Sequence, residues 1–200
     1  MKLNHERKAH KEGFKRVAGI DEAGRGPLAG PVVASAVILK ETRFKQRIDD
    51  SKKLTPCARN LAYEEIIRKA WFGIGIVSEK VIDKLNIYNA TARAMEVAVE
   101  NLGIKPDCLL VDGRIRIKST CKKVNLIGGD SKSLSIACAS IIAKVTRDNI
   151  MCKYHKRYPA YGFLRHKGYG TKEHLRKLLK HGPSPIHRFT FKPVKDQSHK

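Results

Sequence analysis

The stretch VAGIDEAGRGPLAG, residues 17–30, constrains the fold more than any other part of the chain. Its apolar start predicts a short buried strand that ends in two acidic residues, Asp21 and Glu22. Three glycines and a proline follow within eight residues and predict a turn that is almost bare backbone. Any fold of this chain must therefore place two carboxylates at the end of a buried strand, beside a loop with little side-chain bulk.

The next segment, PVVASAVIL at residues 31–39, is apolar and β-branched, so it predicts a second strand paired antiparallel with the first. A strand at this place argues against a dinucleotide-binding turn, because that turn opens a helix. The spacing G-R-G-P-L-A-G is also one residue too long for the dinucleotide fingerprint, and acids before the glycines would repel a pyrophosphate. The G-x-x-x-x-G-K-[ST] phosphate loop is absent as well.

Helix and strand signals alternate along the chain as far as Pro159. Thr55 is a good N-cap and Pro56 suits the first helical position, so a helix is expected over 57–70. Apolar runs predict more strands, and segments closed by turn residues predict more helices. The expected strands are 71–78, 107–113 and 123–130, and the expected helices are 79–86, 88–103 and 131–158, the last beginning near Ser131 or Ser133. This alternation predicts an α/β or α+β fold whose first two strands are antiparallel.

The composition changes after residue 158, where basic residues and histidines become frequent. We expect a loop, a short helix over 171–182 and an extended tail. Residues 1–158 are therefore interpreted as the core, and 159–200 as a subdomain that packs on this core without folding independently. The histidines His166, His174, His181 and His187 show no metal-ligand spacing, so they are expected to be surface or phosphate-facing residues.

The charge balance indicates a polyanionic partner. Lysine and arginine number 41 against 19 acidic residues, which gives a formal net charge of +22. Nucleic acid suits this charge better than a membrane, because no apolar run approaches the roughly 20 residues that span a bilayer. The charged N-terminus has no secretory signal, and the five cysteines form no C-x-x-C pair. These features predict a cytoplasmic protein with reduced cysteines.

Three strand-like runs end in acids, namely Asp21 with Glu22, Asp112, and Asp130. Helix capping or turn closure would account for Asp130 and less well for Asp112, because residues 111–118 continue as a possible strand. Capping does not account for the adjacent pair. Clustered carboxylates repel one another unless cations such as Mg²⁺ or Mn²⁺ neutralise them, and we expect raised pKa values without metal. Two ions about 3.5–4 Å apart would serve phosphodiester hydrolysis.

The two adjacent acids pose a geometric problem, since successive residues of a strand point to opposite faces. Either the strand ends at Asp21 and the backbone turns, or Glu22 lies at the rim and contributes its carbonyl. The glycines that follow have a role in the same site. Gly24 and Gly26 let the backbone approach a ligand closely, and Arg25 between them can bind a phosphate with two N–H groups.

Five segments together carry a resemblance to a known family: GIDEAGRGPLAGPVVASAVIL, DSKKLT, VDG, GGDSKSLSIACASIIAKVTRD and HKGYGTKEH. The chain resembles ribonuclease HII, the type 2 ribonuclease H of bacteria, from about Val17 to the HRFTFKPV tail. The resemblance implies an α/β fold, a ribonuclease H-like core with a mixed central sheet flanked by helices, plus a C-terminal helical extension. Type 3 relatives add an N-terminal domain, for which the residues before Val17 leave no room.

The resemblance also implies roles for individual residues. The metal-binding carboxylates are Asp21, Glu22, Asp112 and Asp130, which would hold Mn²⁺ or Mg²⁺. The loop of Gly24, Arg25 and Gly26 would read a ribose 2′-hydroxyl. Tyr169 would stack on the sugar beyond the scissile ribonucleotide. Lys52 and Lys53 would contact phosphate, although a solvated loop explains them equally well.

We therefore expect a monomeric, metal-dependent endoribonuclease that acts on RNA·DNA hybrids and on ribonucleotide-containing duplex DNA. Water would attack the phosphate in line, cut 5′ of an embedded ribonucleotide, and leave 5′-phosphate and 3′-hydroxyl ends. The alternative is a nucleic-acid-binding module whose acids are structural, with salt-sensitive binding and no need for divalent ions. Among the remaining residues, Lys144 and Asp148 are expected to form a helix salt pair, and Trp71 and Phe72 to lie in the core.

Overall fold

A five-stranded mixed sheet forms the centre of the molecule, in a computed structural model that describes residues 3–197. The predicted antiparallel pair is confirmed as β1 (Val17–Ala23) and β2 (Val32–Leu39). Strand β3 (Ala70–Val77) continues the antiparallel part of the sheet beyond β2. On the other side of β1, strands β4 (Cys108–Asp112) and β5 (Lys122–Leu126) run parallel to it. The sheet order is β3-β2-β1-β4-β5.

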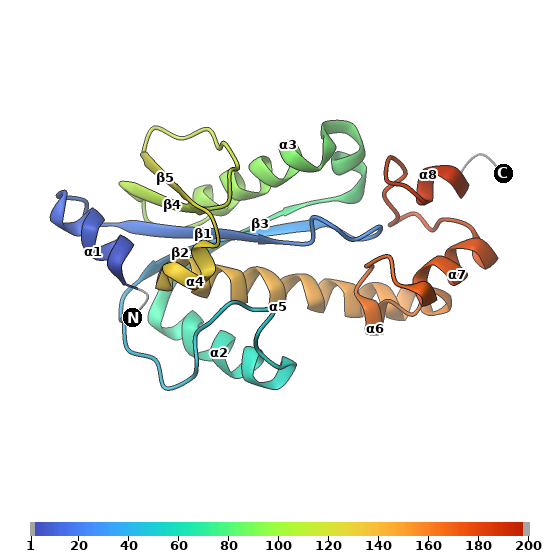
Figure 1. Ribbon diagram of the computed structural model, residues 1–200, viewed down its shortest axis with the longest axis horizontal. Helices are drawn as coiled ribbons and strands as arrows, with labels where there is room; N and C mark the ends of the chain where they lie inside the picture. The colour runs from blue at the N-terminus through green and yellow to red at the C-terminus, as the bar shows by residue number, and fades with distance from the viewer. Residues whose placement is uncertain (1–2, 198–200) are drawn as a thin grey trace.

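Helices cover both faces of this sheet (Figure 1). Helix α3 (Glu79–Glu100) packs on one face, and α2 (Pro56–Lys69) and α5 (Leu134–Arg157) pack on the other. The shorter helices are α1 (Asn4–Lys11), α4 (Gly129–Lys132), the 3₁₀ turn η1 (Pro159–Tyr161), α6 (Phe163–His166), α7 (Lys172–His181) and α8 (Val194–Gln197). The mixed sheet with helices on both faces matches the predicted α/β architecture.

Local signals placed several helix boundaries correctly. Helix α2 begins at Pro56, and the Thr55 hydroxyl accepts a hydrogen bond from the Ala58 N–H at 3.2 Å. The two helices predicted over 79–86 and 88–103 are the two halves of α3, which is kinked at Asn86 with φ 65° and ψ 165°. Such a backbone conformation is rare for a residue with a side chain, so the kink is a strained point.

The long helix predicted over 131–158 begins at the later of its two predicted starts, Ser133, and a separate short helix, α4, precedes it. Ser133 has extended backbone angles and separates α4 from α5, whose first turn it caps by accepting from the Ile136 N–H. A buried carboxylate from α1 holds this break. Glu6 accepts from the Ser133 hydroxyl at 2.6 Å and from the Ser135 N–H at 2.9 Å. The break directs α5 away from α4, which carries Asp130.

Two further expectations about the sheet are wrong. Residues 113–118 form no strand, because Gly113 has a φ of 70° and turns the chain away at the end of β4. Trp71 is 41% exposed on the edge strand β3 instead of lying in the core, and the Lys40 ammonium lies over its ring at 4.9 Å. Phe72 packs partly buried against the core on the α5 side. An edge strand offers one side without a neighbouring strand, so a large ring can remain near solvent there.

The residues after 158 pack on the far end of α5 and on the loop that follows β1 (Figure 1). Their core is a cluster of rings, in which Tyr161 and Phe163 are stacked with centroids 5.4 Å apart. An isolated β-bridge joins Ala29 of the loop to His187 of the tail. Within residues 3–197, no helix has the length and apolar character required to cross a bilayer.

Candidate active site

Three acids that are distant in sequence meet at one end of the sheet. The strand pattern predicted this position for Asp21 and Asp112, but the strand expected over 123–130 ends at Leu126, and Asp130 lies on α4 instead. Because β1 and β4 are parallel neighbours with Ile20 opposite Val111, Asp21 and Asp112 follow at the same edge. Asp130 lies in the first turn of α4, next to Gly129, whose N–H donates to Asp112 Oδ1 at 2.6 Å. The structure thus brings these acids together from β1, β4 and α4.

The fourth acid, Glu22, lies in the same cavity as Asp21 although the strand does not end between them. Strand β1 continues through Glu22, which pairs with Ala34, so the first of the two alternatives, a strand end at Asp21, is wrong. One Glu22 oxygen, Oε1, is 3.4 Å from the Arg25 guanidinium. The other, Oε2, is buried and has no hydrogen-bond partner. A buried carboxylate oxygen without a partner is costly, and a cation in the cavity would relieve that cost.

Asp21, Glu22 and Asp130 have raised pKa values, as expected for a crowded acidic site without metal. Burial and the neighbouring charges of Glu22 and Asp112 raise the pKa of Asp21 well above its ordinary value. Burial also raises the pKa of Glu22, more strongly than the Arg25 guanidinium lowers it. For Asp130, burial acts together with the charges of Asp50 and Asp112 to raise the pKa.

The chemistry of this cluster suits a hard divalent cation. Carboxylate oxygens are the ligands that Mg²⁺ and Mn²⁺ prefer, and Mg²⁺ is commonly held by one or two carboxylates while it keeps several waters. Across residues 3–197, no group of three or more His, Cys, Asp or Glu side chains is already placed to hold a metal ion. The acids would therefore hold a cation only together with water or substrate oxygens as additional ligands.

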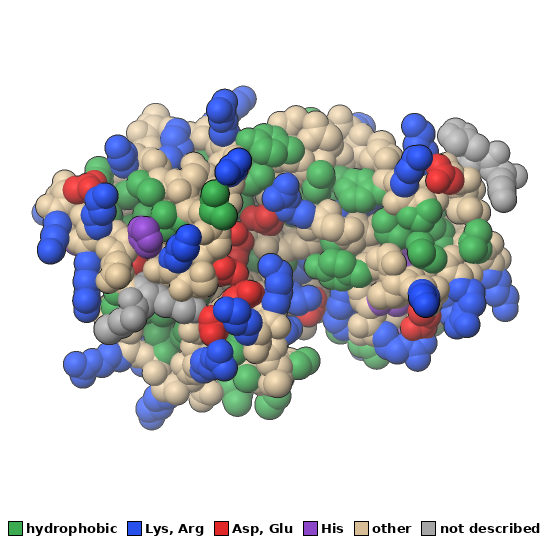
Figure 2. Space-filling view, viewed as in Figure 1, with side chains coloured by type: hydrophobic (Ala, Val, Ile, Leu, Met, Phe, Trp, Pro, Cys, Tyr) green, Lys and Arg blue, Asp and Glu red, His purple; other side chains and the backbone are tan. Residues whose placement is uncertain are grey.

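The cavity beside the acids has a volume of about 800 Å³. Figure 2 shows acidic side chains gathered in the hollow at the middle of this face, with lysines and arginines around it. The lining residues are Asp21, Glu22, Ala23, Gly24, Arg25, Gly26, Ser51, Lys52, Ile87, Ser140, Lys144 and Tyr169. A negative centre inside a positive surround can hold cations and a phosphate backbone at the same time.

A buried arginine from the tail holds the glycine loop from behind. The Arg188 guanidinium donates to the carbonyls of Gly24 at 2.6 Å, Arg25 at 2.9 Å and Gly30 at 2.7 Å. A second buried guanidinium, that of Arg147 on α5, packs against the same loop. A Cβ added to Gly24, whose φ is +97°, would lie only 2.1 Å from Arg147 Nε. The loop therefore has room for glycine alone at this position.

Tyr169 faces the loop across the cavity. Its side chain is 42% exposed, and a Cβ added to Gly26 would lie 3.8 Å from its ring. The Arg147 guanidinium lies over the ring at 5.9 Å. The backbone of Tyr169 is also held, because its carbonyl accepts a hydrogen bond from His174 Nδ1 at 2.9 Å. The predicted loop and the predicted tyrosine therefore form two walls of one cavity.

A family model described as Ribonuclease HII matches residues 18–194 of the chain. The chain belongs to the ribonuclease HII family. The ribonuclease HII of Acetivibrio thermocellus is 53% identical over 188 residues, which is 94% of this chain and 73% of that protein. The ribonuclease HII of Caldicellulosiruptor bescii is 50% identical, covering 93% of this chain and 91% of that one.

Solved structures agree with the family assignment. The ribonuclease H2 from Pyrococcus horikoshii is 28% identical with a TM-score of 0.78, covering 92% of this chain and 98% of that one. This likeness confirms the predicted ribonuclease H-like fold. Membership of the ribonuclease HII family makes the protein a type 2 ribonuclease H, a hydrolase, and implies action on RNA in RNA·DNA hybrids.

Lys52 and Lys53, which the resemblance to ribonuclease HII predicted to contact phosphate, occupy different positions. Lys52 lines the cavity, whereas Lys53 is exposed on the same loop and is not among the lining residues. Burial lowers the pKa of Lys52, but the charges of Asp50 and Asp21 outweigh it, so the pKa is raised. Of these two lysines, Lys52 is the one that the structure places beside the acids.

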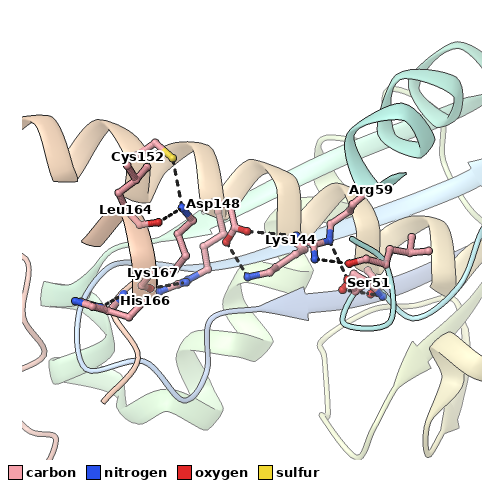
Figure 3. A network of polar contacts seen from close by, with 12 residues as sticks. Ser51, Arg59, Lys144, Asp148, Cys152, Leu164, His166 and Lys167 are labelled. Carbon is pink, nitrogen blue, oxygen red and sulfur yellow. Dashed lines mark hydrogen bonds and ion pairs between the residues drawn. The ribbon is translucent and has the colours of Figure 1, made fainter. Parts of the chain in front are cut away.

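The structure also places Lys144 in the cavity wall, which the sequence did not indicate. Figure 3 shows the polar contacts that Lys144 makes with its neighbours. The predicted salt pair is confirmed, with Lys144 Nζ 2.8 Å from Asp148 Oδ1. Arg59 of α2 joins this pair at 3.5 Å from Asp148 Oδ2, and Ser140 donates to the Ser51 hydroxyl at 2.8 Å. The network fixes one lysine ammonium at the cavity wall. The sequence signal for this position was a single lysine among the small and apolar residues of the first half of α5.

The histidine prediction is wrong for most of its residues. His166, His174 and His187 are buried, and only His181 is exposed. The rings of His166 and His174 are stacked with centroids 4.4 Å apart. Composition suggested a phosphate-facing surface, but all three rings bind backbone groups inside the tail. His166 binds the Tyr161 carbonyl, His174 binds the Tyr169 carbonyl, and His187 accepts from the Ser184 N–H. Carbonyls that are buried in turns need hydrogen-bond donors, and buried side chains can supply them. The sequence carries no pattern that shows which carbonyls need such donors.

Proposed function

We propose that this member of the ribonuclease HII family is a divalent-metal-dependent endoribonuclease that cuts RNA in hybrids and also cuts 5′ of single ribonucleotides embedded in duplex DNA. One observation carries the proposal. Asp21 and Glu22 of β1 line a cavity whose other walls include the Gly24–Gly26 loop and Tyr169, and the charges of Asp112 and Asp130 lie close to Asp21. The net charge of +22 supplies attraction for a duplex.

Each acid has a role in this proposal. Asp21, Glu22, Asp112 and Asp130 hold the Mn²⁺ or Mg²⁺ ions. When bound, a pair of such ions activates the attacking water and stabilises the leaving oxygen. The buried Glu22 Oε2 and the raised pKa of Asp21 indicate that these acids favour cation binding. The products are a 5′-phosphate end and a 3′-hydroxyl end.

The glycine loop recognises the ribose in this proposal. Arg188 binds the carbonyls of Gly24 and Arg25. In a trans peptide the following N–H points opposite to the carbonyl, so the N–H groups of Arg25 and Gly26 point away from the buried guanidinium. A 2′-hydroxyl accepts hydrogen bonds and is the feature that distinguishes RNA from DNA. These two donors are therefore suited to it.

Tyr169 reads the sugar on the other side of the scissile phosphate. An exposed ring can lie flat on a deoxyribose, whereas a 2′-hydroxyl on that sugar would prevent close contact. Together the loop and the ring would select a ribonucleotide followed by a deoxyribonucleotide. All of these side chains come from one copy of the chain, so we expect the monomer to be active.

The metal requirement is the direct test. A duplex with one ribonucleotide should be cut 5′ of that residue in Mg²⁺ or Mn²⁺, and excess EDTA should remove all cleavage while the protein still binds the duplex. A metal-independent, salt-sensitive complex with no cleavage under either ion would instead identify a nucleic-acid-binding module with structural acids. An all-DNA duplex of the same sequence is the control substrate.

A methyl group on Gly26 should impair cleavage without disturbing the fold. The Cβ of Gly26→Ala meets only the Tyr169 ring at 3.8 Å, an ordinary contact, but it enters the space that the ribose needs. We expect kcat/KM to fall about tenfold or more, with the melting temperature near that of the parent. Gly24→Ala is the comparison, and it should lower both values because its Cβ collides with Arg147. Parental kcat/KM for Gly26→Ala would contradict close approach at this loop.

A further inference from the structure

Two adjacent residues of the tail reach the two separate walls of the cavity. His187 and Arg188 are both buried, with 1% and 0% of their surface exposed. The backbone at this point is fixed to the loop after β1, because Ala29 and His187 form a β-bridge and the Arg188 N–H donates to the Leu28 carbonyl at 2.9 Å. Consecutive side chains on such a bridged segment point to opposite sides. The Arg188 side chain therefore reaches the Gly24–Gly26 loop. The His187 side chain reaches His174, which binds the Tyr169 carbonyl.

The Arg188 side chain holds the loop through hydrogen bonds that only a forked donor can make together. Its Nη1 and Nη2 atoms donate to successive carbonyls, those of Arg25 and Gly24, while Nε donates to Gly30 at 2.9 Å. A guanidinium offers five N–H donors in one plane, whereas a lysine ammonium is a point charge without this geometry. The direction of the Arg25 and Gly26 N–H groups thus depends on this one side chain.

The His187 side chain acts through a second histidine. The Ser184 N–H can only donate, so His187 Nδ1 accepts from it at 2.9 Å. In a neutral ring the proton is then on Nε2, which donates to His174 Nε2 at 3.0 Å. His174 therefore carries its proton on Nδ1 and donates it to the Tyr169 carbonyl at 2.9 Å. The three bonds run in one direction from Ser184 to Tyr169.

This series of hydrogen bonds requires His174 and His187 to be neutral. An additional proton on either ring would place two N–H groups face to face. The surroundings favour that state. Burial lowers the pKa of His174 and of His187 to about 4, the charge of His166 contributes to lowering both, and the charge of His174 also lowers the pKa of His187. Glu173 is the acidic group near His174, and it raises the pKa of that ring only slightly against burial.

We propose that His187 and Arg188 are positioning residues that hold the two walls of the substrate reader, the Gly24–Gly26 loop and Tyr169, at a fixed separation. The inference rests on the proposed function of those walls. A reader that recognises a 2′-hydroxyl and the next sugar together must keep both contacts at one spacing. Because adjacent residues support the two walls, a shift of one wall relative to the other would require the tail backbone to deform.

The test compares variants that keep or remove single contacts. His187→Leu keeps the volume and loses the donor to His174, whereas His187→Gln retains an amide N–H at the position of Nε2. Arg188→Lys retains the charge and loses the fork. Exposed positions on α7 provide the matched controls His181→Leu and Arg176→Lys. For each variant, kcat and KM are measured on a duplex with one ribonucleotide and on a uniform RNA·DNA hybrid, and folding is checked by thermal unfolding.

We expect the two residues to give different signatures. His187→Leu should lower the ratio of kcat/KM on the single-ribonucleotide duplex to that on the hybrid by at least about tenfold, and His187→Gln by less than about threefold, since only the former releases Tyr169. Arg188→Lys should lower kcat on both substrates at least about tenfold, because both present a 2′-hydroxyl to the loop. Both control variants should retain the parental ratio.

A double-mutant cycle distinguishes a failure of this positioning role from a failure of the proposed function of Tyr169. In a Tyr169→Ala background, His187→Leu should lower the ratio no further, because its effect passes through the tyrosine. An unchanged ratio for Tyr169→Ala alone would overturn the proposed junction reading. A reduced ratio for Tyr169→Ala with a parental or additive result for His187→Leu would overturn the positioning role. If His187→Leu does not fold, His174→Phe takes its place, because it keeps a ring against Phe163 and His166 and removes the donor to Tyr169.

Discussion

Replacing Asp112 with asparagine should lower kcat by about a thousandfold or more and leave the affinity for an RNA·DNA hybrid within about threefold. Asp112 ends β4 beside Asp21, and its Oδ1 accepts the Gly129 N–H at 2.6 Å. An asparagine keeps an oxygen for that N–H but loses the charge that a divalent cation needs. The basic surface supplies most of the attraction for the duplex and does not change. Single-turnover cleavage and a binding titration in the same buffer measure both effects.

The same substitution should stabilise the metal-free protein. The charge of Asp112 is among the causes that raise the pKa of Asp21, so removing it relieves repulsion between the carboxylates at neutral pH. We expect a higher melting temperature in EDTA and a smaller increase on adding Mg²⁺ than the parent shows. Asp196→Asn, at an exposed position of α8, is the matched control for the change of charge. Turnover near that of the parent for Asp112→Asn would mean that Asp112 is structural.

Removing the ring of Tyr169 should have the second largest effect. Aromatic stacking contributes about 1–3 kcal/mol, so Tyr169→Ala should lower kcat/KM on a single-ribonucleotide duplex roughly 5- to 150-fold. The effect on a uniform hybrid should be smaller, because the sugar beyond each scissile phosphate there carries a 2′-hydroxyl. Total duplex affinity should change little, since many basic residues contribute to it.

Two variants control for this result. Tyr169→Phe keeps the stacking ring and should retain activity near that of the parent. Trp71→Ala removes another half-exposed ring, on the edge strand β3 away from the cavity, and should leave the substrate preference unchanged. If Tyr169→Ala cut the single-ribonucleotide duplex as fast as the parent, junction reading by this ring would have to be abandoned. Matched duplexes that differ only in the sugar 3′ of the ribonucleotide give the most direct comparison.

The parts of the fold that depend on local rules were predictable. The strands before Asp21 and Asp112 are continuous apolar runs, and acids at the ends of parallel neighbouring strands must meet at one edge of a sheet. The cap at Thr55 followed from its side chain and from the proline after it. The sequence predicted two helical segments, 79–86 and 88–103, and the kink in α3 lies at Asn86, the last residue of the first segment.

The errors arise where distant residues decide the local structure. The break at Ser133 depends on Glu6, which lies 127 positions earlier, so the helical pattern of the surrounding residues could not reveal it. In the tail, the buried side chains of His166, His174 and Arg188 bind backbone carbonyls, and any residue type can present a carbonyl. Lys144 looked like half of an ordinary helix salt pair, and only the packing of α5 against β1 and β2 shows that it borders the acids.

The support of the glycine loop by Arg188 has a consequence for synthesis of the protein. These residues are 164 positions apart, whereas Asp21, Asp112 and Asp130 all precede the middle of α5. During translation the acids emerge from the ribosome well before the residue that orients the loop. A growing chain can therefore bring its acids together before Arg188 is available to bind the carbonyls of the glycine loop.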